Sequence, residues 1–122
     1  MPFGNAQRPL YEIKANLFKG LAHPYRIRIL EILSVADEAS VSEMLGETGL
    51  EPSHLSQHLA VLRKYRLVES ERRASAVYYR LAFREVSDLL GIARALLQEI
   101  LGDDEARSAA AAGLPRLASA AR

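Results

Sequence analysis

Hydroxyl, amide and cationic side chains share one face of a helix expected within the stretch from Glu51 to Glu71. Leucines recur there at i, i+4 and i+7, so Leu55, Leu59 and Leu62 make one apolar stripe. At about 100° per residue, the other face lacks carboxylates and holds Ser53, Ser56, Gln57, Ala60 and Lys64. Amides and hydroxyls can hydrogen-bond to base edges in the major groove of DNA, and cations can contact phosphates. The pattern favours a DNA-recognition helix, with an ordinary solvated helix face as the alternative.

The imidazole and thiolate ligands that a borderline-soft transition metal prefers are limited to three histidines, His23, His54 and His58, because the sequence contains no cysteine. His54 and His58 are four residues apart on the expected helix, a spacing at which two imidazoles can share a metal ion. Both lie in the expected recognition helix, where contact with DNA is the competing use. The absence of cysteine also excludes disulfides and thiol redox sensing. We expect no metal site and no cofactor.

Charge is distributed in blocks, although the net charge of the 122-residue chain is only +1. Residues 31–51 hold six acidic and no basic residues, and residues 85–105 hold six acidic residues and one arginine. Between them, residues 53–84 hold seven basic and two acidic residues. A basic block between two acidic ones is typical of a nucleic-acid-binding surface.

Composition narrows the remaining classes of protein. With 49% apolar residues, the chain is expected to form one domain with a small core that dimerisation would help to stabilise. No apolar run approaches the roughly 18 residues of a membrane span, so we expect a cytoplasmic protein without a membrane partner. The sequence offers no Cys/His pair, phosphate-cradling glycine loop or catalytic triad, so an enzyme is not expected.

Periodicity and capping signals predict four helices before residue 65. Pro9 and Pro24 can each occupy the first turn of a helix, and Ser40 with Glu43 forms a capping-box signature. Gly49 can end the third helix in a left-handed conformation. The expected helices span residues 9–21, 24–35, 41–49 and 52–64, and the third and fourth form a helix-turn-helix. The residues expected to face inward from the second helix are Ile27, Leu30 and either Leu33 or Val35.

Past Lys64 the apolar period changes from 3.6 to 2 and predicts a β-hairpin, with strands at residues 67–72 and 77–81. The connecting residues 73–76 contain no Gly, Pro, Asn or Asp, so the conformation of this turn is left open. A last helix is expected from Arg84 to about residue 101, with apolar positions that alternate by three and four. That spacing favours a two-fold dimer seam, with an intramolecular core helix as the alternative.

Three segments in this order resemble the ArsR/SmtB family of winged helix-turn-helix repressors: LFKGLAHPYRIRILEIL, then VSEMLGETGLEPSHLSQHLAVLRKYRLVE, then YYRL. The resemblance covers roughly residues 15–100, and its most specific part runs from Ser56 to Arg63. It implies a mainly α fold with a small β-hairpin, the wing, between the fourth and fifth helices. It also implies a homodimer that binds an imperfect inverted repeat at a promoter, and an effector that usually dissolves the complex. For this chain we expect a small-molecule or protein effector, or none. The dimer would be built from the first and last helices, through Leu10, Ile13, Leu17, Val86, Leu89, Ala93, Leu96 and Ile100.

The chain departs from the metal-sensing pattern of that family. It lacks cysteines in the third helix, and its last helix has Asp88 and Glu99 but no histidine. His58 matches a residue that the family carries irrespective of metal. We therefore expect a regulator that does not use the usual metal sites. Two alternatives stay open: an oxygen-rich metal site at residues 103–105 (Asp103, Asp104 and Glu105), and a winged-helix module that binds protein instead of DNA.

Two further departures affect the backbone. Arg66 stands where the family usually has glycine after the recognition helix, and a left-handed arginine carries a conformational cost. The wing tip, Arg73 to Ala76, also lacks the usual glycine.

The expected DNA contacts divide by chemistry. Hydroxyl, amide and imidazole groups of the recognition helix would contact base edges or nearby phosphates, and cations on three elements would contact the DNA backbone or enter the minor groove. The first group is Ser53, His54, Ser56 and Gln57; the second is Arg26, Arg63, Lys64, Arg72 and Arg73. The expected division of the chain is a flexible N-terminus at residues 1–8, the DNA-binding and dimerisation domain at 9–102, and an alanine-rich tail at 103–122.

Overall fold

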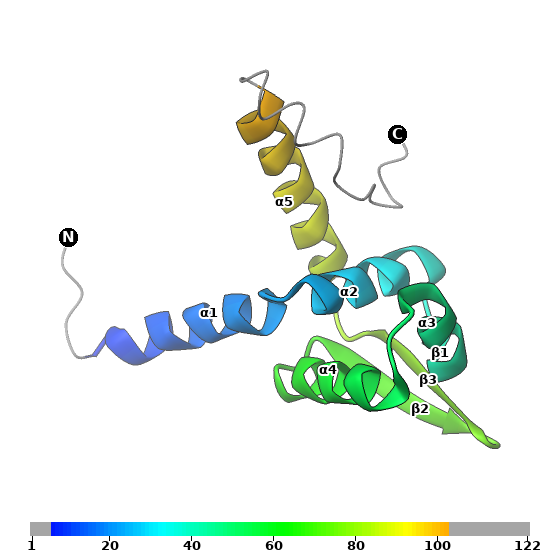
Figure 1. The fold of residues 1–122 in the computed structure, drawn as a ribbon. Coiled ribbons are helices and arrows are strands. Elements are labelled where there is room, and N and C mark those ends of the chain that lie inside the picture. The colour runs from blue at the N-terminus through cyan, green and yellow to red at the C-terminus, as the bar shows by residue number, and fades with distance from the viewer. Residues whose placement is uncertain (1–5, 103–122) are drawn as a thin grey trace.

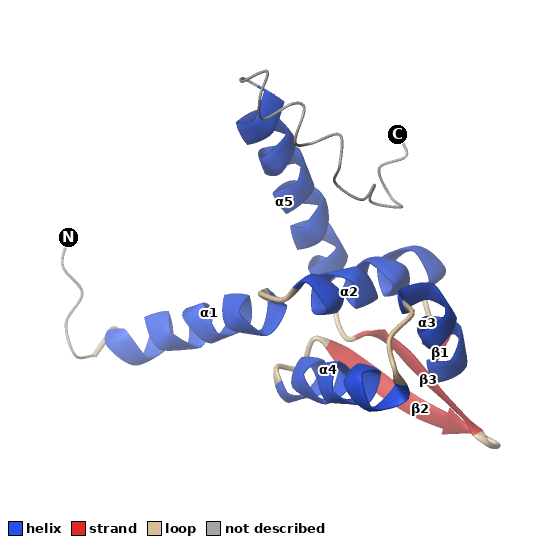
Figure 2. Ribbon diagram, viewed as in Figure 1, coloured by secondary structure: helices blue, strands red, loops and turns tan. Residues whose placement is uncertain are grey.

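The computed structural model describes residues 6–102, which form five helices and a three-stranded antiparallel sheet (Figures 1 and 2). The elements are α1 (Arg8–Leu21), α2 (Pro24–Ala36), β1 (Ala39–Ser40), α3 (Val41–Thr48), α4 (Pro52–Lys64), β2 (Val68–Arg73), β3 (Ala76–Leu81) and α5 (Arg84–Gly102). The winged helix-turn-helix fold expected from the sequence is confirmed. None of the helices within residues 6–102 is long and apolar enough to cross a membrane.

The sheet contains one strand more than the predicted hairpin. β1 pairs with β3 through Ala39 opposite Tyr79 and Ser40 opposite Tyr78, so the strand order is β1-β3-β2. A two-residue strand is too short to show a period in the sequence, which is why it was not predicted. Its pairing joins the start of the helix-turn-helix to the wing.

Local capping signals fix the helix-turn-helix as predicted. The Ser40 hydroxyl accepts a hydrogen bond from the Glu43 amide at 3.0 Å, and the Glu43 carboxylate accepts one from the Ser40 amide at 2.7 Å. This capping box satisfies two amides that the first turn of α3 leaves without helical partners. Gly49 ends α3 with a φ of 71°. Helix α1 begins at Arg8, one residue before the predicted start.

Arg66 adopts the left-handed conformation that makes glycine usual after a recognition helix. Its φ is 61°, and its amide donates to the Arg63 carbonyl at 2.9 Å. The next amide, of Leu67, donates to the Leu62 carbonyl at 2.9 Å. These two bonds form a Schellman motif, and its two apolar residues, Leu62 and Leu67, are both buried. The motif and this burial offset the cost of a left-handed arginine.

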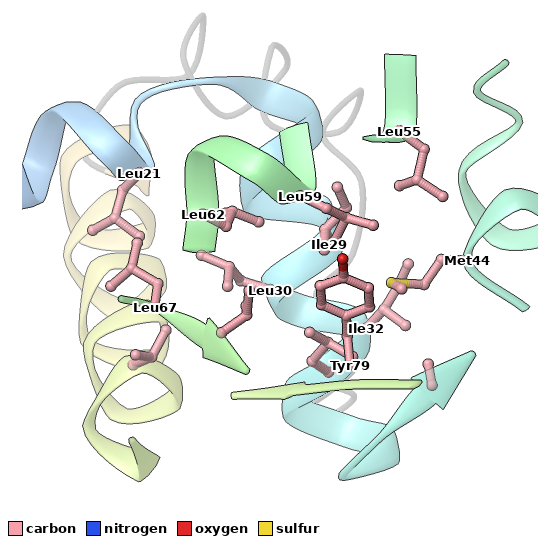
Figure 3. Close-up of a cluster of buried hydrophobic side chains, with 14 residues drawn as sticks. Leu21, Ile29, Leu30, Ile32, Met44, Leu55, Leu59, Leu62, Leu67 and Tyr79 are labelled. Atoms are coloured by element: carbon pink, nitrogen blue, oxygen red, sulfur yellow. The ribbon is translucent and has the colours of Figure 1, made fainter. Parts of the chain in front are cut away.

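The core lies between α2, α4 and the sheet (Figure 3). Leu55, Leu59 and Leu62 are at most 2% exposed, which confirms the predicted inner stripe of α4. The prediction for α2 was wrong for Ile27, which is 37% exposed, and correct for Leu30; of the two alternatives Leu33 and Val35, Leu33 is the buried one. Helix α2 contacts α3, α4, α5 and the sheet, so its buried side is wider than one stripe. The residues buried on α2 are Ile29, Leu30, Glu31, Ile32 and Leu33.

Helices α2, α3 and α4 and the sheet form a winged body, and α1 and α5 extend from it as two arms in different directions (Figure 1). Their large apolar side chains are mostly exposed, with Ile13 at 66% and Ile92 at 67%. Arm α1 joins the body where Gly20 packs on the ring of Tyr65. A Cβ at Gly20 would lie 2.7 Å from Tyr65 Cδ2, so the close packing requires glycine.

Candidate nucleic-acid interface

Helix α4 presents an exposed polar face opposite its buried leucines. All six of its predicted DNA-contacting side chains are exposed, namely Ser53, His54, Ser56, Gln57, Arg63 and Lys64. Within residues 6–102, the side chains of Ser53, Ser56 and Gln57 make no hydrogen bond to the protein. The Lys64 ammonium lies 5.9 Å from the centre of the Tyr65 ring. The face therefore offers donors and acceptors to a ligand without first breaking hydrogen bonds of its own, and its cations are exposed beside them.

His58 lies on the flank of this face and packs against the α1–α2 turn. Its ring centre is 4.4 Å from that of His23 and 6.0 Å from that of Tyr25. His23 in turn caps α2, because its Nδ1 accepts a hydrogen bond from the Tyr25 amide at 3.2 Å. Burial lowers the pKa of His58, and the neighbouring His23 and Arg26 lower it further. The sequence did not indicate this contact, since the two histidines are far apart in the chain.

No metal centre is assembled in the described part of the chain: within residues 6–102, no three His, Cys, Asp or Glu side chains are grouped to hold an ion. His54 is exposed, whereas His58 is directed to His23. The acidic residues at 103–105, considered as an alternative site, lie outside the described residues.

Arg26, which was predicted to contact the DNA backbone, is half-buried and caps α1. Its Nε donates to the Gly20 carbonyl at 2.7 Å, and its Nη2 donates to the Lys19 carbonyl at 3.2 Å. These carbonyls belong to the last turn of α1, where carbonyls lack the usual i+4 amide partners; the Lys19 carbonyl also accepts from the Ala22 amide at 3.3 Å. The guanidinium thus fastens the α1 arm to α2.

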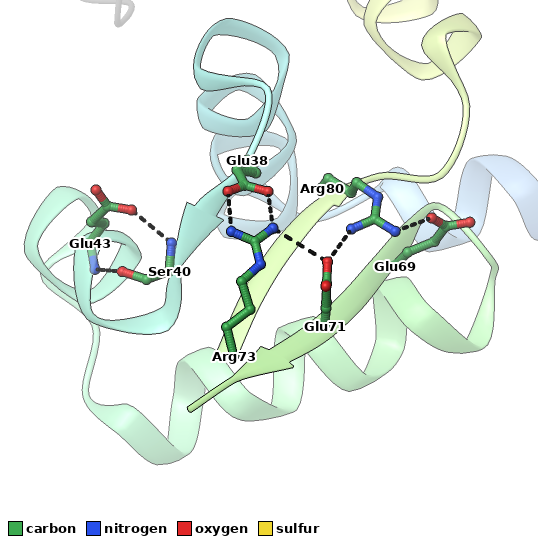
Figure 4. Close-up of polar contacts among 7 residues, drawn as sticks. All are labelled: Glu38, Ser40, Glu43, Glu69, Glu71, Arg73 and Arg80. Carbon is green, nitrogen blue, oxygen red and sulfur yellow. Dashed lines mark hydrogen bonds and ion pairs between the residues drawn. The ribbon is translucent and has the colours of Figure 1, made fainter. Parts of the chain in front are cut away.

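The cations of the wing are mostly paired with carboxylates (Figure 4). Arg73 forms a two-bond bridge to Glu38, with Nη1–Oε2 at 2.8 Å and Nη2–Oε1 at 2.6 Å, and a third contact to Glu71 at 3.3 Å. Arg80 pairs with Glu69 and Glu71, each at 3.3 Å. The hydrogen bonds from Arg73 lower the pKa of Glu38, and Glu38 raises the pKa of Arg73. The sequence placed Arg73 at the wing tip but did not indicate Glu38 as its partner.

The residues predicted for the dimer seam fall into two groups. Val86 is 7% exposed and belongs to the core, because the first turn of α5 packs on the winged body, and Leu89 is half-buried against the core. The others are exposed: Leu10, Ile13, Leu17, Ala93, Leu96 and Ile100. Further exposed apolar residues lie on the same arms, namely Phe18, Ile92 and Leu97.

The fold and the polar face of α4 define a DNA-binding protein of the winged helix-turn-helix class. The family model described as bacterial regulatory protein, arsR family, matches residues 23–70. The chain is 48% identical over 96 residues to the uncharacterized HTH-type transcriptional regulator Rv0081 of Mycobacterium tuberculosis, and the match covers 78% of this chain and 83% of the relative. The chain therefore belongs to the ArsR family and is a DNA-binding transcriptional regulator.

Further relatives agree with this assignment. The biofilm growth-associated repressor of Xylella fastidiosa is 38% identical over 76 residues, which cover 62% of this chain and 66% of the repressor. The crystal structure of Rv0081 matches with a TM-score of 0.73 and 47% identity, over 78% of this chain and 95% of that one. A solution structure of Mb0332 (fragment 1–100) from Mycobacterium bovis, described as a homodimeric winged helix-turn-helix DNA-binding domain, matches with a TM-score of 0.71 and 27% identity, over 81% and 91% of the two chains.

Proposed function

We propose that the protein is a cytoplasmic repressor that binds an inverted repeat in promoter DNA as a homodimer and catalyses no reaction. The observation that carries the proposal is the exposed, carboxylate-free face of α4, which is held rigidly by the buried leucines on its other side. Such a helix fits the major groove, where side chains of these types read base edges. The name of the Xylella relative supports repression as the outcome.

The exposed apolar arms support the homodimer. Large apolar side chains continue along both α1 and α5, and an exposed apolar surface of this extent is typical of an interface. The homodimeric description of the Mb0332 fragment supports the same assembly. A two-fold dimer would present two α4 helices to successive major grooves, about 34 Å apart.

Individual roles follow from the chemistry of the exposed side chains. Ser53, Ser56 and Gln57 would contact base edges or adjacent phosphates, with His54 beside them. Arg63 and Lys64 would bind phosphates at the end of α4. The chain lacks the thiolates of the usual metal sensors, so we propose regulation through a small-molecule or protein effector instead of a metal cofactor.

The proposal is tested by fluorescence anisotropy of the chelator-treated protein on its own upstream DNA, at two salt concentrations, with random DNA as competitor. We expect specific binding that weakens steeply with salt, because phosphate contacts release counterions. Binding that appears only after a metal is restored would refute metal independence. Absence of any salt-dependent binding would favour the protein-interaction module, and a monomer in sedimentation analysis would refute the homodimer.

A matched pair of variants tests the assignment of α4. Gln57→Ala should weaken binding to the upstream DNA by roughly 1 to 3 kcal/mol and leave random DNA almost unaffected, because the amide is expected to read a base. Gln98→Ala removes the same group from α5 and should change neither. Equal losses of Gln57→Ala on both DNAs would show that Gln57 does not read sequence.

A further inference from the structure

The Arg73–Glu38 bridge joins two parts of the molecule that are distant in sequence. Glu38 stands in the turn between α2 and β1, and Arg73 is the last residue of β2. A guanidinium that binds a carboxylate through two parallel bonds has a fixed direction as well as a fixed distance. The Arg73 guanidinium is fixed further by the Tyr78 ring, whose centre is 4.5 Å away. The bridge therefore sets the position of the wing tip relative to the turn that precedes β1.

Strand alternation places Arg72 and Arg73 on opposite faces of the hairpin. Arg73 shares the solvent face with Glu69 and Glu71, which are 53% and 49% exposed at their side chains. Arg72 pairs with Val77, on the face where Val68 and Tyr79 are buried against the core. Since α4 also packs against this core, Arg72 lies on the side of the hairpin that α4 occupies.

Arg72 and Arg73 also differ in their electrostatic surroundings. The ion-pair network on the solvent face contains three carboxylates, of Glu38, Glu69 and Glu71, and two guanidiniums, so it is net negative. A phosphate that approached Arg73 would have to displace Glu38 and would meet these carboxylates. Arg72 has no ion pair within residues 6–102, so its charge is available.

The backbone on both sides of the bridge is held in an uncommon conformation. Asp37, directly before Glu38, has a φ of 65°, and Ala74, directly after Arg73, has a φ of 55°. Left-handed residues other than glycine persist where the surrounding structure fixes them, and they often mark functional positions. Both residues with a positive φ here flank a partner of the same ion pair.

We propose that Arg73 is a positioning residue that ties the wing to the helix-turn-helix through Glu38, and that the wing contacts DNA phosphate through Arg72. The proposal rests on the proposed DNA-binding function and names the side chain of the wing that carries it out. Because β1 leads directly into the Ser40 cap of α3, the bridge makes the wing and the helix-turn-helix move as one body.

Identical substitutions at the two adjacent positions separate a phosphate contact from a positioning role. Arg72→Gln should reduce the slope of log affinity against log salt by about 0.9, the value for one lost phosphate contact. Arg73→Gln should leave that slope unchanged and weaken binding only by roughly two- to fivefold, as expected when an exposed ion pair that orders the wing is lost. A slope reduced by Arg73→Gln as much as by Arg72→Gln would overturn the proposal.

A second measurement follows the bridge without DNA. In an NMR titration of the free protein, Arg73→Gln should move the pKa of the Glu38 carboxyl back toward its ordinary value, and Arg72→Gln should not. An unchanged Glu38 titration in Arg73→Gln would refute the bridge. If the wild-type protein binds no DNA, the proposed function fails and the role of Arg72 fails with it, while the titration still decides whether Arg73 holds Glu38.

Discussion

The recognition helix and the wing are both rich in cations in the sequence, yet they offer them to a ligand differently. On α4, the polar side chains are exposed and largely without partners, and Arg63 and Lys64 follow at its end. On the wing, Arg73 and Arg80 are engaged by Glu38, Glu69 and Glu71. Charge counted along a sequence is therefore different from charge that a phosphate can reach. The solvent face of the wing is ordered by ion pairs, whereas α4 is held by its buried leucines.

The largest expected effect tests how α4 is held. Leu62→Ala should lower the free energy of unfolding by about 2 to 5 kcal/mol, because Leu62 is fully buried and its loss leaves a cavity beneath the helix. Urea denaturation measures the change. Val35→Ala, at a 54% exposed position, should stay within about 0.5 kcal/mol of the wild type. A similar loss in both variants would mean that α4 does not depend on this core.

An intermediate effect on stability is expected at the two residues with a positive φ that follow α4 and β2. Arg66→Gly after α4 and Ala74→Gly at the wing tip should each raise the free energy of unfolding by up to about 1 kcal/mol, because glycine adopts a positive φ without steric cost. Gly49→Ala, at a φ of 71°, should have the opposite sign. Thermal unfolding measures all three. Destabilisation by Arg66→Gly would show that the arginine side chain contributes more than its backbone costs.

The smallest expected effect is a dependence of stability on pH, which comes from His58 on α4 and from Glu38 beside the wing at different pH values. The pKa of His58 is below its ordinary 6.5, so the unfolded chain binds a proton first and stability should fall as the pH drops below that value. The pKa of Glu38 is below its ordinary 4.5, so its contribution is present above 4.5 and is lost as the pH falls through the lowered value. Thermal unfolding across this pH range should show that His58→Gln removes the upper decline and Glu38→Gln the lower one. If His58→Gln retains the full upper decline, another group causes it.

The features that could be predicted from the sequence are those that local rules decide. The i, i+4, i+7 leucines gave the buried side of α4, and Ser40 with Glu43 gave the start of α3, because both depend on residues within one or two helical turns. The left-handed backbone at Arg66 was suggested only by the resemblance to the family, which usually has glycine at this position.

The features that could not be predicted depend on tertiary contact. Glu38 meets Arg73, and His23 meets His58, only in the folded chain, because the two residues of each pair are 35 positions apart in the sequence. Arg26 looked like a surface cation because its helical position faces away from the core, but the end of α1 lies there and its carbonyls of Lys19 and Gly20 accept from the guanidinium. The polar face of α4 was predicted more fully than the wing because it makes few contacts with the rest of the chain.

Helix α1 projects from the contact between Gly20 and Tyr65, so any rotation at this contact would displace the far end of the helix. Helix α1 has 14 residues, so it is about 21 Å long at 1.5 Å per residue, and a 10° rotation at the joint would move its free end by about 4 Å. That displacement is close to the rise of one base pair, about 3.4 Å along a strand. The tight contact of Gly20 with the Tyr65 ring and the two hydrogen bonds from Arg26 resist such a rotation, so this joint at the end of the recognition helix would set the spacing of the two half-sites in the proposed dimer.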